Sequence, residues 1–420
     1  MSSIGSFQSG PLRPLFTRLL PKPRVWPCGT LPSFDASLAL GYSIRPHFPL
    51  DFKKWTFLNH GAFGLVTHRA LAQSSKWRMH AETQPCRFYD RELMPSLVAS
   101  LQQLATFFSI PALNLVFVQN ATTGINAVLR SLPFDTSSNI VAFTTTYGAV
   151  KTALHHTKAN IELLDISHQS SDEEIHALLR NKLTCKKVPD LVVLDHITSS
   201  TARRFPLETL IPLCHAHNVP VLVDGAHAPL MLDLDLHKLG ADFYVGNLHK
   251  WMCNTKGCAF LYVSNLEKHD TIRPSIVSHG YHIGFQEAFI WDGLRDYAAA
   301  LTVSDTLDQW KALGVERSRT YMVDLVQQGA KHVSEVWQSG PILHSTGVSM
   351  AMIRIPYQSS SGKDRASTDA IQQHFYEQGI EVPVKQMGNE YYVRVSAHVY
   401  NTMEDFEHLA RATILHTEPC

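Results

Sequence analysis

Several features are missing from this sequence, and each absence excludes a class of protein. No stretch approaches 18 uninterrupted apolar residues, so a membrane-spanning helix is not expected, although 45% of the residues are hydrophobic. Basic and acidic residues both number 37, which leaves no excess charge for binding nucleic acid or a membrane surface. The 23 histidines are scattered without HExxH spacing, so no metal site is predicted. No GxGxxG turn follows the first predicted strand, which argues against a nucleotide-dependent dehydrogenase.

Cysteine and early acidic residues are also scarce. The seven cysteines lack the paired spacing of zinc sites, and their odd number is typical of free thiols in a reducing compartment. The first acidic residue is Asp35, and an acid-poor start can be a mitochondrial transit peptide. Five prolines within residues 11–27 argue against the amphipathic helix that such a peptide needs. We therefore expect an irregular extension at 1–54 and a cytoplasmic protein, with a mitochondrial location as the alternative.

Strand-like and helix-like patterns alternate through most of the chain. Short apolar runs, such as a predicted strand at 139–143, alternate with segments of helical spacing, such as a predicted helix from Asp172, which predicts an α/β fold with a mostly parallel, doubly wound sheet. Toward the end, the strand-like stretches GVSMAMIRIP and YYVRVSA accompany helical segments and predict a smaller α+β domain. The 420 residues exceed what one hydrophobic core usually serves. We therefore predict a large domain at 55–300 and a small domain at 301–420.

The stretch from Val219 to Met252 carries the strongest chemical signal. A β-branched run ends at Asp224, a segment with helical spacing follows, and a second short run at 243–245 leads to Lys250. Two strands joined by a crossover helix are normally parallel, so their carboxyl ends open on the same side of the sheet, where α/β proteins bind ligands. Asp224 and Lys250 are therefore predicted to face one crevice, although they are 26 residues apart in sequence.

A carboxylate and a lysine at neighbouring strand ends are what a pyridoxal phosphate site needs. The lysine forms a Schiff base with the cofactor, and the carboxylate pairs with the pyridinium nitrogen. Each residue alone has an ordinary explanation, because an Asp at a strand end often caps a helix and a Lys beside a Trp is usually solvated. If neither residue bound a cofactor, the motifs DGAH and NLHK would both have to occur at the ends of successive strands by coincidence.

The turn NATTGIN offers a site for the phosphate. Ala121, Thr122 and Thr123 lie between a predicted strand and a helix expected to start near Thr123. Backbone N–H groups at a helix start, together with hydroxyls, can bind a phosphate. Small residues before a helix are common, so this turn is informative only beside the lysine and the carboxylate.

These motifs resemble the class V aminotransferase superfamily of pyridoxal phosphate enzymes over about Phe57–Arg411. Further stretches that carry the likeness are NHGAFG, QPCRF, YGAVKT and DHITSS. Within the superfamily, the sequence is most similar to the branch of isopenicillin N epimerase and hercynylcysteine sulfoxide lyase. The resemblance implies fold type I of the PLP-dependent transferases, pyridoxal 5'-phosphate as cofactor, a small-molecule amino-acid substrate and a homodimer.

The resemblance also implies roles for single residues around the cofactor. Lys250, Asp224 and His227 would be catalytic, with His227 as the hydrogen-bond partner of the ring hydroxyl. Tyr147 would stack on the ring, although from sequence it could equally be a core tyrosine. Asp195 would line the same side of the pocket. The turn at Ala121–Thr123 would be the phosphate loop, and the remaining phosphate contacts from the same subunit would be Asn247 and His249.

Three further residues would contact the substrate. Arg394 matches the carboxylate-binding arginine of the family, and a bidentate carboxylate contact favours Arg over Lys. Asn59 and His60 would lie in the loop that covers the substrate.

The type of reaction is less well specified. In the family, cysteine desulfurases carry a nucleophilic Cys in the small-domain half, and none lies here between Cys258 and the terminal Cys420, so persulfide transfer lacks its residue. The likeness favours a lyase that acts through an external aldimine, cleaves a C–S or C–C bond in the side chain of its substrate, and has a role in secondary metabolism. A Cα epimerase and an aminotransferase are the alternatives. A non-catalytic relative would keep the fold, but retention of Lys250 with Asp224 argues against it.

Overall fold

Seven strands form the central sheet, in the order β2-β8-β7-β6-β5-β3-β4. The computed structural model describes residues 12–29, 31–168, 170–357 and 367–414. β3, β4, β5, β6 and β7 pair in parallel, whereas β8 is antiparallel to both β7 and β2. The strands are β2 (Leu115–Val118), β3 (Asn139–Phe143), β4 (Asn160–Leu164), β5 (Leu191–Asp195), β6 (Val221–Asp224), β7 (Phe243–Asn247) and β8 (Ala259–Val263). The predicted mostly parallel sheet is confirmed.

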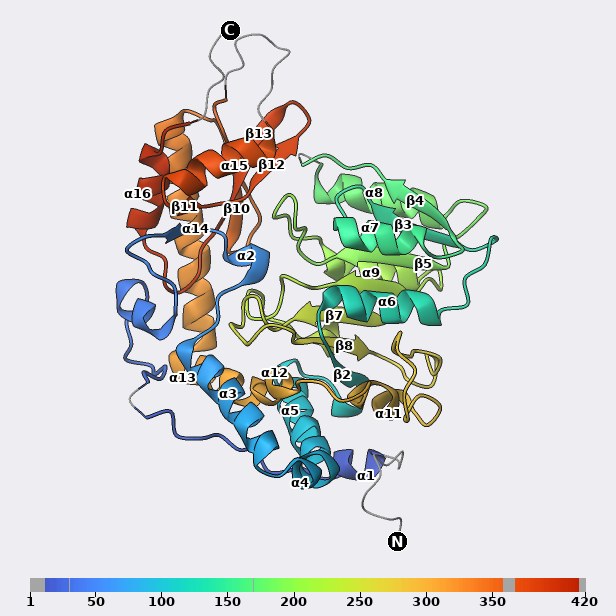
Figure 1. Ribbon diagram of the computed structural model, residues 1–420. Coiled ribbons are helices and arrows are strands. Elements are labelled where there is room, and N and C mark those ends of the chain that lie inside the picture. The colour runs from blue at the N-terminus through green and yellow to red at the C-terminus, as the bar shows by residue number, and fades with distance from the viewer. Residues whose placement is uncertain (1–11, 30, 169, 358–366, 415–420) are drawn as a thin grey trace.

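Helices cover both faces of this sheet (Figure 1). One face packs against α6 (Ala121–Ser131), α7 (Gly148–His155) and α11 (Phe285–Ile290), and the other against α5 (Leu93–Phe107), α8 (Asp172–Leu183) and α9 (Leu207–His215). Alternate residues of a strand enter opposite layers: Val141 and Phe143 join one apolar cluster, Ile140 and Ala142 the other. This period of two explains why these strands read as continuous apolar runs, and it confirms the doubly wound architecture.

The segment between β6 and β7 is the main departure from the predicted elements. In place of a crossover helix it holds turns and the single helical turn α10 (Leu236–Leu239). Pro229 has no N–H to donate, and Leu230 has a left-handed φ of 69°, which stops a helix there. The predicted crossover helix is therefore wrong. β6 and β7 are nevertheless parallel, as expected.

A second, four-stranded antiparallel sheet has the order β12-β13-β10-β9. Its strands are β9 (Leu343–His344), β10 (Met350–Arg354), β12 (Val384–Met387) and β13 (Glu390–Ser396). One face packs against α14 (Val315–Trp337), α15 (Thr368–Glu377) and α16 (Met403–Arg411). Near the start of the chain, β1 (Thr56–Phe57) pairs in parallel with β11 (Ile380–Glu381). β1 and β11 form a separate two-stranded sheet, and Leu58 and Ile380 pack in the same apolar cluster as β10 and β13. The division at 55 and 301 stays a prediction.

Shorter elements and the helices beside the first sheet are the remaining regular elements of the described residues. They are α1 (Arg13–Phe16), a 3-10 helix at Tyr42–His47, α2 (His60–Phe63), α3 (His68–Thr83), α4 (Pro85–Arg87), a π-helical turn at Phe88–Glu92, a 3-10 turn at Ala112–Asn114, α12 (Ala298–Leu301) and α13 (Val303–Leu313). Among the residues that the structure describes, no helix combines the length and apolar character needed to cross a membrane.

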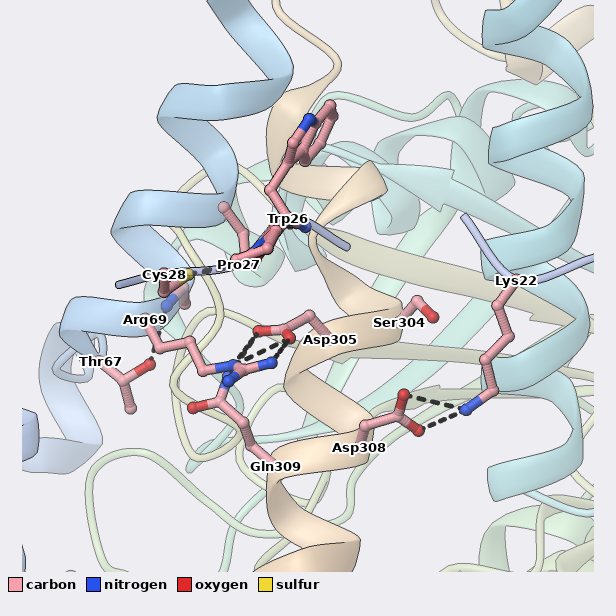
Figure 2. A network of polar contacts seen from close by, with 12 residues as sticks. Lys22, Trp26, Pro27, Cys28, Thr67, Arg69, Ser304, Asp305, Asp308 and Gln309 are labelled. Carbon is pink, nitrogen blue, oxygen red and sulfur yellow. Dashed lines mark hydrogen bonds and ion pairs between the residues drawn. The ribbon is translucent and has the colours of Figure 1, made fainter. Parts of the chain in front are cut away.

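A polar network joins α3 to α13 and to the N-terminal extension (Figure 2). Arg69 donates to both carboxylate oxygens of Asp305, with Nη2 2.7 Å from Oδ1, and Gln309 Nε2 donates to Oδ2 at 2.8 Å. The Asp305 side chain is only 4% exposed. One turn along α13, Asp308 forms an exposed ion pair with Lys22. The two acidic residues of one helix therefore sit in opposite environments.

We expect Asp305→Ala to lower the free energy of unfolding by about 2–4 kcal/mol, because it leaves the Arg69 guanidinium without its buried partner. Asp308→Ala is the matched control and should cost less than about 1 kcal/mol, since its ion pair is exposed. Urea unfolding of both variants, followed by circular dichroism, measures the two effects. Equal midpoints for the two variants would contradict the assignment of Arg69–Asp305 as the stabilising pair.

Candidate active site

Two carboxyl groups lie side by side at the carboxyl ends of β5 and β6. Asp195 and Asp224 are register partners on these neighbouring parallel strands, and both are buried. Burial raises the pKa of both groups, and the charge of Asp224 raises the pKa of Asp195 further. The Ala226 N–H, 3.0 Å from Asp224 Oδ1, and the nearby Lys250 lower the pKa of Asp224. The pair therefore favours one negative charge, held on Asp224.

Lys250 follows β7 and brings its amine to this acidic pair. Burial, and next the charge of Arg394, lower the pKa of Lys250 to about 8, while Asp224 opposes this shift. Its Nζ lies 3.4 Å from His227 Nε2, and Trp251 Nε1 donates to His227 Nδ1 at 3.4 Å. Burial lowers the pKa of His227 well below its usual value, so the ring is neutral. With Nδ1 accepting, the single N–H of His227 is on Nε2 and points at the lysine amine.

The predicted phosphate turn is organised by two asparagines. Asn120 caps α6, and its Oδ1 accepts the Thr123 N–H at 2.9 Å, which is why the helix begins at Ala121 and not near Thr123. Asn247 Oδ1 accepts the Ala121 N–H at 2.9 Å. The structure thus brings Asn247 to the turn, as predicted. Two of the three expected N–H groups are bonded within the protein, which leaves Thr122 at the exposed start of the helix.

His249 and Tyr147 lie at the edges of the same space. His249 Nδ1 is 2.7 Å from the carbonyl oxygen of Cys258, and burial lowers the pKa of His249 to about 4, so the ring is neutral with Nδ1–H donating. Its Nε2 can then only accept. Tyr147 precedes α7 and is 48% exposed, so it is not a core tyrosine. Its backbone N–H lies against the Asp195 carboxyl group.

Arg394 comes from the second sheet and is buried in the interface between the two sheets. Its Nη1 donates to the carbonyl oxygen and hydroxyl of Ser199, at 2.5 and 3.2 Å. Burial lowers the pKa of Arg394 to about 10. Within the described residues its Nε has no hydrogen-bond partner. A buried guanidinium with a free donor fits a carboxylate ligand.

The two residues predicted to cover the substrate have different surroundings. Asn59 Nδ2 donates to Glu381 Oε1 at 3.0 Å, and its own Oδ1 is buried with no partner in the described part of the sequence. His60 is fully buried, with Nδ1 2.8 Å from the Tyr400 hydroxyl and Nε2 3.1 Å from the carbonyl oxygen of Lys250. Both ring nitrogens of His60 are therefore bonded inside the protein. This geometry favours a structural contact with the Lys250 backbone over contact with a substrate.

Lys385 was missed by the sequence reasoning. It pairs with Tyr392 in the register of β12 and β13, so it projects from the same face of the sheet as Tyr392 and Arg394. Burial and the charge of Arg394 lower the pKa of Lys385. None of the ion pairs of the described residues includes it. Apolar and polar residues alternate in VPVKQM and in YYVRVSA, which could have predicted two strands. The sequence does not show which residues of the two strands face each other, because the fold sets that register.

A groove of about 650 Å³ lies between the segments at 201–208 and 342–346. Its wall includes Arg203 and Arg204, which are already bonded to Asp172 and Glu208. None of the predicted site residues lines it. The groove is therefore separate from the space around Lys250.

The residues present fit pyridoxal phosphate. Asp195 Oδ2, His196 Nε2 and Arg394 Nε are buried polar atoms without partners within the described residues, and a polar ligand would satisfy them. A protonated ring nitrogen next to Asp224 would offset the burial that raises the pKa of both acids. Lys250 would supply the amine, and the start of α6 with Asn247 would hold the phosphate.

Comparison with known proteins agrees with this donor set. The sequence profile described as "Aminotransferase class-V" matches residues 91–409. The protein is 27% identical to the L-cysteine desulfhydrase of Arabidopsis thaliana, over 84% of this sequence and 86% of that protein. It is 23% identical to the hercynylcysteine sulfoxide lyase of Schizosaccharomyces pombe (88% and 96% covered) and 24% identical to the isopenicillin N epimerase of Streptomyces clavuligerus (84% and 93% covered).

A solved structure shares the fold. The complex of the cystine C-S lyase C-DES with cysteine persulfide has a TM-score of 0.73 and 21% sequence identity, over 85% of this protein and 96% of that one. Fold type I and the predicted branch of the superfamily are thereby confirmed. With the profile spanning most of the sequence, the protein belongs to the class V aminotransferase family of pyridoxal phosphate-dependent enzymes.

Proposed function

We propose that this enzyme is a lyase that cleaves a C–S bond in the side chain of an amino acid, or less favourably a C–C bond. The observation that carries the proposal is a buried Lys250 amine, with a pKa of about 8, whose neighbours are Asp224 and Arg394. Two relatives are a cysteine desulfhydrase and a hercynylcysteine sulfoxide lyase, which supports a sulfur leaving group. No Cys lies between Cys258 and Cys420, and Cys420 is outside the described residues.

The side chains divide the work of such a reaction. When bound, pyridoxal phosphate withdraws electrons from the bonds at the substrate Cα. Asp224 holds a proton on the ring nitrogen by keeping its negative charge in a buried place. Arg394 binds and orients the substrate carboxylate. The Lys250 amine changes protonation near pH 8, so it can take the Cα proton and later return it to the departing group.

The remaining predicted roles belong to the same proposal. His227 would hydrogen-bond the ring hydroxyl, Tyr147 would stack on the ring and Asp195 would line its edge. Thr122 and Asn247 would donate to the phosphate, and His249 would lie beside it as a neutral ring that keeps its N–H on the Cys258 carbonyl oxygen. Asn59, with its free oxygen, would face the substrate amine or side chain.

We also propose a homodimer, a cytoplasmic location and a role in secondary metabolism. Large apolar side chains on and near α3 support the homodimer, since Met79 is 69% and Leu294 73% exposed. The odd number of cysteines, all free among the described residues, supports a reducing compartment. The role in secondary metabolism follows only from the branch of the family.

A Cα epimerase and an aminotransferase remain the alternatives, and the isopenicillin N epimerase relative favours the first. Incubation of the holoenzyme with cysteine and S-substituted cysteines in deuterated water separates the three reactions. We expect pyruvate together with sulfide or a thiol, measured by mass spectrometry. Recovered amino acid with inverted, deuterated Cα would show an epimerase, and a keto acid that keeps its sulfur would show transamination. Either result without pyruvate would refute the lyase.

The pKa of Lys250 gives a pH prediction for the cofactor-free protein. Only an unprotonated amine attacks an aldehyde, so imine formation at Lys250 should rise through about pH 8, far below the range of an ordinary lysine. Arg394→Leu removes a positive charge that lowers this pKa, so the midpoint should move upward by roughly one unit. Arg394→Lys keeps the charge and is the control. Absorbance of the imine as a function of pH measures the midpoint, and a downward move in Arg394→Leu would contradict the assignment.

The unpaired ammonium of Lys385 predicts a preference for substrates with an anionic side chain. Lys385→Met should lower kcat/KM for S-carboxymethylcysteine about 10- to 100-fold, the range for a lost hydrogen bond to a charged group. The value for S-methylcysteine should change little, and Lys385→Arg should preserve the selectivity. Steady-state kinetics with both compounds test this. An equal loss for the two substrates would show that Lys385 has no part in side-chain recognition.

A further inference from the structure

Two buried histidines stack against each other next to the backbone of Lys250. His60 lies at the start of α2, and His398 follows β13, two residues after its end. Their ring centroids are 3.8 Å apart, and the ring planes differ by 12°. Both side chains are fully buried. The early part of the sequence, the second sheet and the lysine segment of the first sheet therefore meet at this pair.

The pair binds two consecutive carbonyl groups of the lysine segment. His60 Nε2 is 3.1 Å from the carbonyl oxygen of Lys250, and His398 Nε2 is 3.1 Å from the carbonyl oxygen of Trp251. These two residues carry the reactive amine and the indole that donates to His227. Any shift of this segment would move the Lys250 amine together with the Trp251 indole, whose N–H sets the tautomer of His227.

The protonation state of both rings follows from their partners. Burial lowers the pKa of His60 well below its usual value and that of His398 to about 3, so both rings are neutral and carry one N–H each. A carbonyl oxygen can only accept, which places both N–H groups on Nε2. His60 Nδ1 is then an acceptor, and the Tyr400 hydroxyl, 2.8 Å away, donates to it. Tyr400 thus fixes the tautomer of His60.

A metal site is the obvious alternative for this cluster. His60, Cys253 and His398 offer three donor atoms within 4.8 Å of one another. A bound ion must lie close to the plane of each imidazole that holds it, and rings stacked 3.8 Å apart have no common plane. Moreover, burial raises the pKa of the Cys253 thiol to a value far above neutral, and a metal needs the thiolate. The cluster therefore suits hydrogen bonding better than metal binding.

We propose that His60 and His398 are positioning residues that fix the Lys250 amine relative to Arg394. His398 is four residues after Arg394 on the same segment of the second sheet, so a rigid connection runs from the carboxylate-binding guanidinium to the lysine backbone. This inference rests on the role proposed above for Lys250. Loss of the connection would leave the cofactor and carboxylate contacts in place but misalign the amine.

The test is the rate at which the cofactor-free protein captures pyridoxal phosphate as an imine, followed by stopped-flow absorbance and normalised to folded protein. We expect His398→Leu to slow capture about 10- to 100-fold, the size of effect that a misplacement of about 1 Å produces. Once the protein is loaded, kcat should fall while KM for the amino acid changes little. His269→Leu, which replaces another buried histidine, 7% exposed and bonded to Asp242 just before β7, is the control and should capture at the wild-type rate.

Two further variants separate positioning from packing. His398→Gln keeps an N–H donor at the place of Nε2 and should restore most of the capture rate, whereas equal losses in the Gln and Leu variants would overturn the proposal. If His398→Leu does not fold, Tyr400→Phe takes its place, because it removes the donor that fixes the His60 tautomer and should slow capture several-fold. Unchanged capture in a folded His398→Leu or Tyr400→Phe variant would also overturn it. Capture by Lys250→Ala would instead refute the proposed function.

Discussion

The desolvation of one amine and two carboxyl groups at the carboxyl end of the first sheet is the constraint on which the site depends. Parallel pairing of β5 and β6 places Asp195 and Asp224 in register. Because the two carboxyl groups are buried side by side, they cannot both be fully ionised. The same burial lowers the pKa of Lys250 to about 8. Burial makes the amine give up its proton more easily, while the Ala226 N–H and Lys250 oppose the effect of burial on Asp224 and help it to keep its charge. A cationic ring nitrogen would pair with Asp224, and an aldehyde on the same ligand would take up the amine.

The second sheet completes this environment from the other side. Arg394, from β13, is buried against Ser199 of the loop that follows β5, and its positive charge helps to lower the pKa of Lys250. Lys385 lies on the same face, one strand away. An amino acid bound between the two sheets would meet cations at its carboxylate and an amine at its Cα. On this proposal, substrate specificity would depend on how the second sheet is held over the first, and the His60–His398 pair is one of the contacts that hold it there.

The sequence predicted those features that depend on local pattern. The strand Asn139–Phe143 and the helix Asp172–Leu183 begin at the residues where the sequence predicts them. The apolar run of the strand and the capping box of the helix are both local features. Asp224 and Lys250 were predicted to meet because parallel strands share an open edge. The crossover helix after β6 was wrong, since Pro229 and the left-handed Leu230 outweigh the helical spacing around them.

What the sequence could not reveal depends on contacts between distant segments. His60 lies in a motif of the family, yet its environment comes from Tyr400 and from the backbone of Lys250. Lys385 is placed on the same face as Arg394 only by the pairing register of β12 with β13.

The most direct test of the account is to treat the holoenzyme with borohydride, digest it and locate the reduced cofactor by mass spectrometry. We predict that the label is on Lys250, that Lys250→Ala carries none, and that Lys256→Ala, which removes an exposed lysine six residues further on, is labelled as fully as the wild type. A label on another lysine, or a labelled Lys250→Ala variant, would contradict the account.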